Sequence, residues 1–447
     1  MKKNKINPRI FFRIPKAIHL EMLNDLRRKH SHAWERMGFL HTRLKWLDEK
    51  TVLIIANSYQ VLEDEDYIRD STVGAKIGSE AIRKAMQLMM DNQTGGFHVH
   101  LHDHKGRPVP SLVDERGIPG IIESLSHATK EQATGMLILS GDGFYDEIRI
   151  PGVKKKLKAD SISVVGFPIH VNFGDSGSMI SSKVFTRQSF LGLHSQNYFD
   201  CIRVGIIGYG GGGSHVGQQL AHIGIKNITV FDDDIIEDSN LNRLVGGQWK
   251  DVINKLAKTS IAKRVIRAIL PGAKITIVNS RWQEVPEKLQ QCDIVIGCGD
   301  TYAERQQAEA ECRRYLIPYV DIGMDVYQSE HGYHSISGQI MASVPGKPCF
   351  WCSGFLTEEK LGQEAAKYGN TGGRPQVVWP NGVLASTAVG IIVELITGWT
   401  GRKDAAVYLE YDGITGHIKD HVRLLYLADI CNHYPLINSG PARFSEL

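Results

Sequence analysis

The chain has 447 residues, 42% of them hydrophobic and 23% charged, which is typical of a soluble globular protein and long enough for two domains. Its formal net charge of +3 favours neither nucleic acid nor an anionic membrane as a partner. The longest apolar run, residues 383–399, is interrupted by Glu394 and predicts a buried helix, and the basic N-terminus predicts no secretory signal. Seven scattered cysteines favour a reducing cytoplasm.

The first half of the chain predicts an α/β domain. Residues 17–48 have the apolar spacing of a helix. Short apolar runs predict strands at residues 51–58, 94–102, 134–140 and 160–171, and an amphipathic stretch predicts a helix at residues 79–92. A Gly/Ser-rich stretch at about residues 170–190 predicts a connector, so we expect one domain over residues 1–182 and another over residues 183–447.

The second half shows short apolar strands that alternate with helical stretches. The predicted strands are residues 202–208, 227–233, 274–280, 293–299 and 317–323. This alternation predicts βαβ units and a mostly parallel sheet.

A glycine cluster lies between the first of these strands and the next helix. It contains Gly208, Gly210, Gly211 and Gly213. Glycines at such a turn let the backbone approach phosphates, and the helix N-terminus offers free N–H groups. The next strand ends at Asp232, where an acid would meet ribose hydroxyls. These features fit any nucleotide-binding Rossmann domain, including that of an NAD-dependent oxidoreductase.

Five sequence features in a fixed order narrow this interpretation. They are the glycine segment 208–214, Asp232 with Asp234, the segment Ser-Asn-Leu-Asn-Arg at 239–243, Lys258 thirteen residues before Pro271, and Asp300. This order resembles the ThiF/MoeB/ubiquitin-activating superfamily of adenylating enzymes, and residues 185–196 resemble the segment that precedes the first strand in that family. The resemblance covers residues 186–400 and implies a Rossmann-like domain that binds ATP and magnesium.

The resemblance also implies chemical roles for these residues. Attack of a carboxylate on the α-phosphate of ATP builds negative charge, so it needs cations and a metal rather than a strong base. Arg243 and Lys258 would neutralise the phosphates, Asp300 would hold magnesium, and Asp232 would bind the ribose. Arg187 would act as an arginine finger, which in this family comes from the other subunit of a dimer; solvated surface charges are the alternative for the three cations. The expected ATP-binding set is completed by Gly208, Gly210, Gly211, Gly213, Ser214, Asp234 and Asn240.

Two features of the family are altered in this chain. Members often form a thioester on a cysteine about four residues before a Gly-Val pair, but the matching residues 376–386 contain no cysteine. Many members bind structural zinc through two Cys-x-x-Cys pairs, whereas this chain has one pair, Cys349 and Cys352, and later Cys431 and His433. These four side chains suit a tetrahedral zinc site, and a metal-free loop with two buried thiols is the alternative.

Four histidines occupy alternate positions near the end of a predicted strand in the first half. Histidines two residues apart on a strand point to one side, so His100 and His102 can face one ion. The following turn would bring Asp114 round as a third ligand and leave one position for water, as in a catalytic zinc site. The pairs His98/His100 and His102/His104 are also open, and so is a surface histidine tract that binds metal adventitiously.

These residues resemble the JAB/MPN metalloprotease motif, in which His-x-His is followed by Ser-x-x-Asp. Ser111 and Asp114 match its ending, with a spacing one residue longer than usual, and Glu35 matches its upstream general base. The resemblance covers roughly residues 15–180 and implies a zinc-bound water that attacks a peptide or isopeptide carbonyl. Glu35 would move the proton and Ser111 would donate to the oxyanion.

Together the two resemblances match fusions found in bacterial ubiquitin-like conjugation systems. They imply a cytoplasmic, dimeric enzyme that adenylates the C-terminal glycine of a small β-grasp ubiquitin-like protein and processes or removes that modifier with its N-terminal domain. A separate conjugating enzyme is a further candidate partner. Three alternatives are open: activation of a sulfur carrier in cofactor synthesis, an N-terminal domain that only docks the modifier, and a dinucleotide oxidoreductase.

Overall fold

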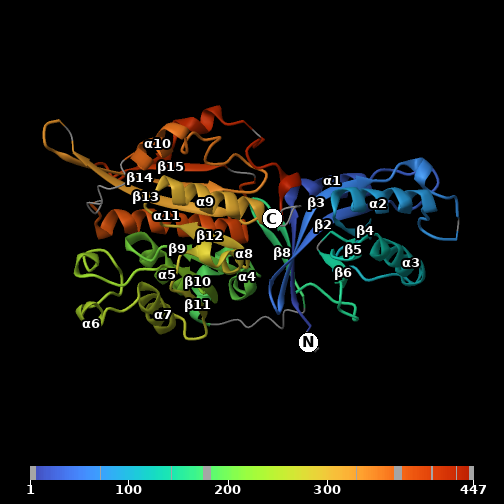
Figure 1. Cartoon of the computed structure of the whole chain (residues 1–447), viewed down its shortest axis with the longest axis horizontal. Coiled ribbons are helices and arrows are strands. Elements are labelled where there is room, and N and C mark those ends of the chain that lie inside the picture. The colour runs from blue at the N-terminus through green and yellow to red at the C-terminus, as the bar shows by residue number, and fades with distance from the viewer. Residues whose placement is uncertain are drawn as a thin grey trace. The chain divides into compact units, whose positions relative to one another are not determined.

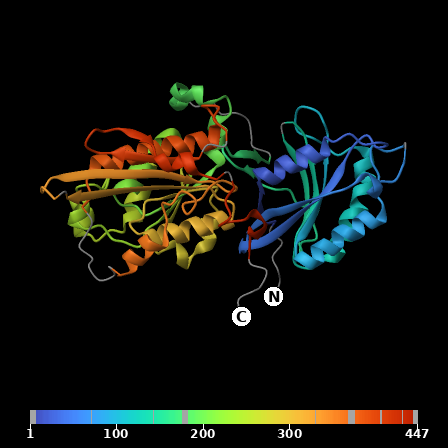
Figure 2. The ribbon, with the colours of Figure 1, turned by 90° about the horizontal axis from the view of Figure 1, so that it is seen from above.

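The computed structural model describes residues 7–441 except residues 71, 142, 175–182, 329, 367–374, 404–405 and 429. The chain divides into two compact units, one made of residues 1–165, 170–176 and 436–447 and the other of residues 166–169 and 177–435 (Figure 1). Figure 2 shows the red segment that begins at residue 436 beside the blue strands of the first unit, where Asn57 Nδ2 donates to the carbonyl of Ser439 at 2.6 Å. The expected boundary between residues 182 and 183 adjoins residues outside the described part and stays a prediction.

The first unit is built on an eight-stranded mixed sheet with the order β6-β5-β4-β2-β3-β1-β7-β8. Its strands are β1 (Arg9–Pro15), β2 (Met37–Asp48), β3 (Thr51–Val61), β4 (Gly95–Leu101), β5 (Thr134–Leu139), β6 (Phe144–Arg149), β7 (Ser161–Val165) and β8 (His170–Phe173). Its helices are α1 (Lys16–Leu26), α2 (Ser79–Asn92), α3 (Leu112–Ala128) and the 3₁₀ turns η1 (Asp64–Asp66) and η6 (Leu436–Asn438).

The predicted helix over residues 17–48 is correct only for its first part. Helix α1 ends at Leu26, and β2 takes the rest of the predicted range. Residues 38–44 of β2 are buried on both faces, so they lack the two-residue alternation that marks a half-exposed strand. The predicted strands at 51–58, 94–102 and 134–140 and the helix at 79–92 are confirmed by β3, β4, β5 and α2, and residues 160–171 contain β7 and the start of β8.

Strand β4 and helix α3 position the histidines of the first unit. Strand β4 pairs antiparallel with β2, where Met37 faces His100, and parallel with β5. All seven residues of β4 are buried. Helix α3 packs against β4 and β5, so its first turn lies near the carboxyl end of β4.

The second unit is built on another eight-stranded sheet, with the order β11-β10-β9-β12-β13-β14-β15-β16. The strands from β11 to β13 in this order are parallel, as predicted, and the remaining pairs are antiparallel. The strands are β9 (Arg203–Ile207), β10 (Asn227–Phe231), β11 (Lys274–Val278), β12 (Ile294–Gly297), β13 (Tyr319–Gln328), β14 (His334–Ser343), β15 (Val407–Asp412) and β16 (Ile418–Asp420). The sequence patterns did not predict β14, β15 or β16.

The helices of the second unit connect these strands. They are η2 (Lys183–Leu191), α4 (Ser195–Cys201), α5 (Gly211–Ile223), η3 (Asp238–Asn240), α6 (Trp249–Ile253), α7 (Lys258–Ile269), η4 (Trp282–Glu284), α8 (Pro286–Gln290), α9 (Tyr302–Arg314), α10 (Glu358–Ala366), α11 (Val378–Thr397) and η5 (Val422–Tyr426). By length and composition α11 could cross a membrane, but it packs against α5, β13 and β14, and 67% of its apolar window is buried. The prediction of a buried helix here is confirmed.

The strand order of the second unit places a crevice at the carboxyl end of β9. The chain runs from β9 outward through β10 to β11 and then returns to β12 on the other side of β9. The helices that leave β9 and β12 therefore diverge, and ligands of open α/β sheets bind at such a switch point.

Candidate functional site

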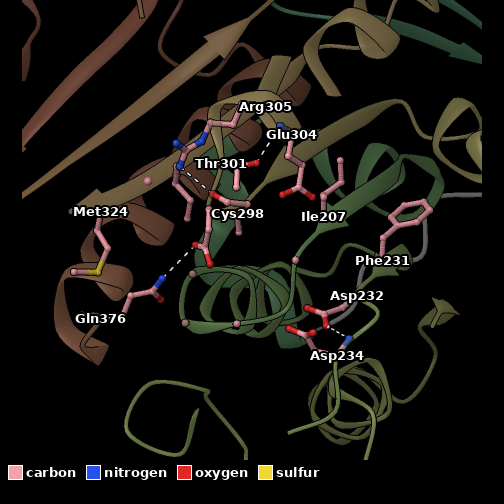
Figure 3. A pocket seen from close by; sticks show the side chains of 18 of the residues that line it. Ile207, Phe231, Asp232, Asp234, Cys298, Thr301, Glu304, Arg305, Met324 and Gln376 are labelled. Atoms are coloured by element: carbon pink, nitrogen blue, oxygen red, sulfur yellow. Dashed lines mark hydrogen bonds between the residues drawn. The ribbon is translucent and has the colours of Figure 1, made fainter. Parts of the chain in front are cut away.

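A cavity of about 690 Å³ lies at this switch point (Figure 3). Its wall is formed by residues that follow the carboxyl ends of the parallel strands, among them Gly208, Asp232 and Asp300, and by the cations Arg243 and Lys258. The structure thus brings together, in one cavity, residues that the sequence motifs place far apart in the chain.

The glycine cluster forms the turn from β9 into α5. Gly208 has a φ of +82°, a conformation that favours glycine, and a Cβ there would lie 3.2 Å from the carbonyl oxygen of Cys298. A Cβ on Gly213 would lie 1.9 Å from the carbonyl oxygen of Gly208, so only glycine fits where α5 crosses the turn. Gly208, Gly210 and Gly211 line the cavity, and the first turn of α5 offers backbone N–H groups without helical acceptors.

The acids after β10 hold the cavity wall in place. Asp232 accepts hydrogen bonds from the backbone N–H of Tyr209 at 2.5 Å and of Asp234 at 2.9 Å. Burial raises the pKa of Asp232 above its ordinary value. The carboxylate of Asp234 pairs with Lys258 Nζ at 2.6 Å, so Asp234 holds Lys258 at the cavity.

Two of the predicted ATP-binding side chains shape loops instead of lining the cavity. Ser214 Oγ accepts the N–H of Val245 at 3.0 Å, which ties the start of α5 to the segment after η3. Asn240 Oδ1 accepts the N–H of Glu237 at 3.1 Å. These bonds fix the backbone that carries Arg243, whose Nη1 donates to the carbonyl of Ser239 at 2.7 Å.

Asp300 lies two residues before α9, and its Oδ1 accepts a hydrogen bond from Gln376 Nε2 at 3.2 Å. The sequence motifs did not predict Gln376, nor the buried ion pair next to Asp300. In that pair Arg305 Nε lies 3.0 Å from Asp321 Oδ1, and Arg305 Nη2 donates to the carbonyl of Gly299 at 2.9 Å. Burial raises the pKa of Asp321 to about 6.

A sequence signal for this ion pair exists. Arg305 lies five residues after Asp300 and therefore about one helical turn into α9. Asp321 lies in β13 opposite Gly297, the last residue of β12. Side chains at the carboxyl ends of parallel strands lie at one edge of the sheet, so the sequence indicates that edge for both residues, but their pairing depends on β12 and β13 being neighbours.

Arg187 lies in η2, is exposed, and is not among the described residues that line the cavity. Gln188 Nε2 donates to the carbonyl of Ile223 at 2.8 Å, which anchors η2 at the C-terminal end of α5. The glycine loop lies at the other end of α5, about 20 Å away for a helix of 13 residues. An arginine side chain does not span that distance within its own chain.

The four predicted zinc ligands of the second half come together. One ligand atom from each of Cys349, Cys352, Cys431 and His433 lies within 4.8 Å of the others. The two sulfurs of Cys349 and Cys352 are 3.6 Å apart, and each lies 3.4–3.5 Å from His433 Nδ1. Sulfur and nitrogen ligands on a tetrahedral zinc lie about 3.4–3.8 Å apart. The donor set and its spacing therefore fit zinc.

Replacement of Cys349 by serine is expected to remove one zinc ion per chain and to lower the melting temperature, because three ligands hold structural zinc poorly. Elemental analysis of the purified protein measures the zinc, and a thermal melt measures stability. Cys201→Ser is the matched control, since Cys201 lies in α4, outside the cluster. Equal zinc content in both variants would contradict the site.

The three predicted ligands of the first unit also converge. His100 Nε2 and His102 Nε2 are 3.3 Å apart, and each lies 3.4 Å from an oxygen of Asp114. Nitrogen and oxygen ligands about 2.0–2.1 Å from a tetrahedral zinc are about 3.4 Å apart, so this spacing also fits zinc. Nδ1 of His100 is buried and has no hydrogen-bond partner among the described residues. In most metal-binding histidines, the ring nitrogen that does not bind the metal donates a hydrogen bond.

The other histidines of the tract do not join this group. His98 is fully buried, its Nε2 lies 3.2 Å from Met37 Sδ, and burial lowers its pKa to about 3. His104 is exposed, and its Nδ1 donates to the carbonyl of Lys105 at 2.9 Å. Of the three open registers, the geometry favours His100 with His102.

Glu35 and Ser111 lie near the group in different ways. Burial and the neighbouring His100 lower the pKa of His102, while the negative charges of Asp114 and Glu35 act in the opposite direction. Ser111 is the N-cap of α3: its Oγ accepts the N–H of Asp114 at 3.2 Å, and its own N–H donates to Asp114 Oδ2 at 2.7 Å. Ser111 thus positions Asp114, a role that the motif alone did not predict.

Comparison with known proteins matches residues 185–429 to the ThiF family. The chain is 31% identical to the SAMP-activating enzyme E1 of Haloferax volcanii over 153 residues, which are 34% of this chain and about half, 52%, of that enzyme's length. It is 27% identical to the molybdopterin-synthase adenylyltransferase of Escherichia coli over 222 residues, which are 49% of this chain and 82% of that enzyme.

Among solved structures, Escherichia coli MccB is similar at 21% identity with a TM-score of 0.45, covering 56% of this chain and 72% of MccB. PaaA is similar at 18% identity with a TM-score of 0.45, covering 56% of this chain and 87% of PaaA. The family match spans more than half of the chain and includes the glycine loop, both cations and Asp300. The chain belongs to the ThiF family.

Proposed function

We propose that the second unit uses ATP to adenylate the C-terminal glycine of a small β-grasp protein, either a ubiquitin-like modifier or a sulfur carrier. The observation that carries this proposal is the cavity at the switch point, in which the glycine loop, Arg243, Lys258 and Asp300 meet. Membership of the ThiF family supports it, as do relatives that are named as an activating enzyme and an adenylyltransferase. The family match does not favour a dinucleotide oxidoreductase.

The residues of the cavity suit this chemistry. The substrate carboxylate attacks the α-phosphorus, and the bond to the leaving pyrophosphate breaks, so negative charge grows on the phosphate oxygens. The glycine loop offers N–H groups to these oxygens, and Arg243 and Lys258 offer positive charge. Asp232 would bind the ribose, and Asp300 would hold magnesium, which neutralises phosphate charge when bound.

Exchange of labelled pyrophosphate into ATP tests the proposal directly. The full chain should catalyse this exchange only when a β-grasp protein ending in Gly-Gly is present, because the reversible step is formation of the acyl-adenylate. The same β-grasp protein without its last glycine is the matched control. Exchange that does not depend on the intact C-terminus would contradict the proposed substrate.

We propose that Arg187 completes the cavity of a second copy in a two-fold dimer, since it lies too far from its own. Arg187→Ala should slow adenylation by on the order of a hundredfold or more, as for other arginine fingers. Mixing Arg187→Ala chains with Asp300→Ala chains should then restore activity, because one of the two composite sites has both residues. If native mass spectrometry shows subunit exchange and no activity returns, Arg187 does not act in trans.

We further propose that the first unit is a zinc-dependent peptidase that cleaves after the C-terminal glycine of the same modifier. The convergence of His100, His102 and Asp114 carries this proposal. Zinc held there would supply an activated water near neutral pH. Glu35 would take the proton of that water. Ser111 fixes Asp114 as the N-cap of α3. It would donate to an oxyanion only after its Oγ releases the N–H of Asp114.

Replacing both His100 and His102 by alanine is expected to remove one zinc ion per chain while the ion at the Cys/His cluster stays. Elemental analysis gives the stoichiometry, and pyrophosphate exchange reports whether the second unit is intact. The matched control is the chain in which His98 and His104 are both replaced by alanine. This control should keep the zinc ion of the first unit. Equal zinc in both variants would mean adventitious binding by the tract, or an N-terminal unit that docks the modifier without cleaving it.

A further inference from the structure

Residues 431–441 form one short segment that is fixed at two places, one in each unit. At one end, Cys431 and His433 belong to the Cys/His cluster of the second unit. At the other end, residues 436–441 pack on strands β2 and β3 of the first unit. Two residues separate these two parts. A change at one end can therefore reach the other end through the chain itself.

The first-unit end is a contact between buried polar groups. The carbonyl of Ser439 accepts hydrogen bonds from Asn57 Nδ2 at 2.6 Å and from Arg43 Nη1 at 3.3 Å. Arg43 Nη1 also donates to the carbonyl of Pro441 at 3.4 Å. A Cβ on Gly440 would lie 3.3 Å from Arg43 Cβ, so the glycine lets the backbone approach this side chain closely. Because all three side chains of the first contact are buried, and buried donors need acceptors, the segment stabilises this part of the first unit.

The second-unit end is held by the zinc ligands. His433 Nδ1 lies 3.5 Å from Cys349 Sγ and 3.4 Å from Cys352 Sγ. Zinc held there would tie the segment to the turn that carries both cysteines, and binding of structural zinc is coupled to folding of its ligands.

Upstream of the Cys/His cluster the chain is held less firmly. Among the described residues, the nearest long-range anchor there is Arg423, whose Nη1 donates to the carbonyl of Ser353 at 3.2 Å. Between Arg423 and Cys431 lie three large side chains that are 72–81% exposed: Leu425, Tyr426 and Ile430. Without zinc, the free tether before Ser439 would therefore begin near residue 424.

We propose that residues 431–441 are a zinc-dependent clasp: zinc at the Cys/His cluster holds residues 436–441 on the first unit, and loss of the ion releases them. The proposal needs neither adenylation nor peptide cleavage, only the ion. Zinc shortens the tether from residues 424–438 to residues 434–438, about threefold, and the chance that a tether closes falls with about the 3/2 power of its length, so zinc should strengthen docking about fivefold. By linkage, docking strengthens zinc binding by the same factor.

Hydrogen exchange tests the clasp from the zinc end. The zinc-loaded full chain is compared with Cys352→Ser, in which elemental analysis confirms loss of one ion. The N–H of Ser439, which donates to the carbonyl of Leu436 at 3.0 Å, should exchange about fivefold faster in the variant. The matched control is the chain in which His100 and His102 are both replaced by alanine, which lacks the other ion and should exchange at the original rate.

An unchanged exchange rate in Cys352→Ser would overturn the clasp. It would show that Tyr434, whose ring centroid lies 5.9 Å from the guanidinium carbon of Arg313, holds the segment without the ion. A Cys/His cluster that binds no zinc in the unaltered chain would overturn the proposal as well.

Zinc affinity tests the clasp from the first-unit end. A fluorescent chelator competes for the single ion of the chain in which His100 and His102 are both replaced by alanine. Adding Asn57→Ala to this chain removes a donor to Ser439 and should raise the Kd for zinc by up to about fivefold. Asn92→Ala is the matched control, since Asn92 lies in α2 and donates within that helix.

A longer tether gives the same test without removing any side chain. Insertion of about ten Gly and Ser residues between Pro435 and Leu436 restores the tether length expected without zinc, so it should also raise the Kd about fivefold. The same insertion after Thr415, in the exposed turn between β15 and β16, is the matched control. If Asn57→Ala weakens zinc binding and the insertion after Pro435 does not, the substitution acts on the fold of the first unit and the clasp is overturned.

Discussion

Replacement of Asp300 by asparagine is expected to slow adenylation about a thousandfold while the chain stays folded. Asp300 is exposed just before α9 and lines the cavity, where the proposed function has its carboxylate hold magnesium beside the ATP phosphates. The amide of asparagine keeps the shape of the side chain but loses its negative charge, so it binds magnesium more weakly. Pyrophosphate exchange measures the rate, and a thermal melt measures folding.

Asp420→Asn is the control for this variant, because Asp420 is an exposed carboxylate on β16 and does not line the cavity. It removes the same charge from the same unit and should change the rate less than about twofold, as surface charges contribute little. A loss of less than about tenfold in Asp300→Asn would show that another group holds the metal. A lowered melting temperature would instead assign Asp300 a structural role.

The parts of the fold that the sequence predicts are those in which local pattern and tertiary environment agree. Strands β9, β10 and β12 are short apolar runs because parallel strands are covered on both sides. Strand β2 contradicts its local pattern, because its residues 38–44 are buried on both faces, and buried Arg43 donates to the carbonyl of Ser439 at 3.3 Å, a partner 396 residues away. A partner so distant in the chain leaves no two-residue alternation in the sequence of β2, so residues 37–48 were predicted as part of a helix.

The candidate site also contains residues that the sequence predicts and residues that it misses. The glycine loop, Asp232, Lys258 and Asp300 were predicted because each lies at a fixed distance from a strand end or a motif. The Arg305–Asp321 pair was missed because it depends on which strands are neighbours in the sheet, and Gln376 was missed because it lies 76 residues from Asp300, outside every motif.

In the first unit the ligands were predicted, but the role of Ser111 was not. Its position between the histidine tract and Asp114 matches the motif, whereas its bonds are those of a helix N-cap. Helix α3 was not predicted, so the capping role was hidden.

Glu35→Gln is expected to slow cleavage of a modifier fusion on the order of a thousandfold and to leave adenylation unchanged, because a general base contributes about 10²–10⁴-fold. The segment that carries Glu35 is held firmly: the N–H groups of Trp34 and Glu35 donate to the carbonyl of Gly74 at 2.8 and 3.3 Å. Arg36, next in the chain, is buried and donates to the carbonyls of Arg28 and Lys29. A neutral glutamine can keep this placement but cannot take a proton from water.

The assay follows release of a reporter fused after the C-terminal glycine, with zinc content measured in parallel. Glu123→Gln is the matched control, since Glu123 is an exposed carboxylate on α3 that takes no part in the ligand group. Unchanged zinc with lost cleavage separates proton transfer from metal binding, and a retained pyrophosphate exchange shows that the second unit still works. If cleavage survives Glu35→Gln but is lost when His100 and His102 are both replaced by alanine, the zinc ion is required for catalysis. A residue other than Glu35 would then be the general base. Loss of both activities in Glu35→Gln would mean that the two units act as one coupled enzyme.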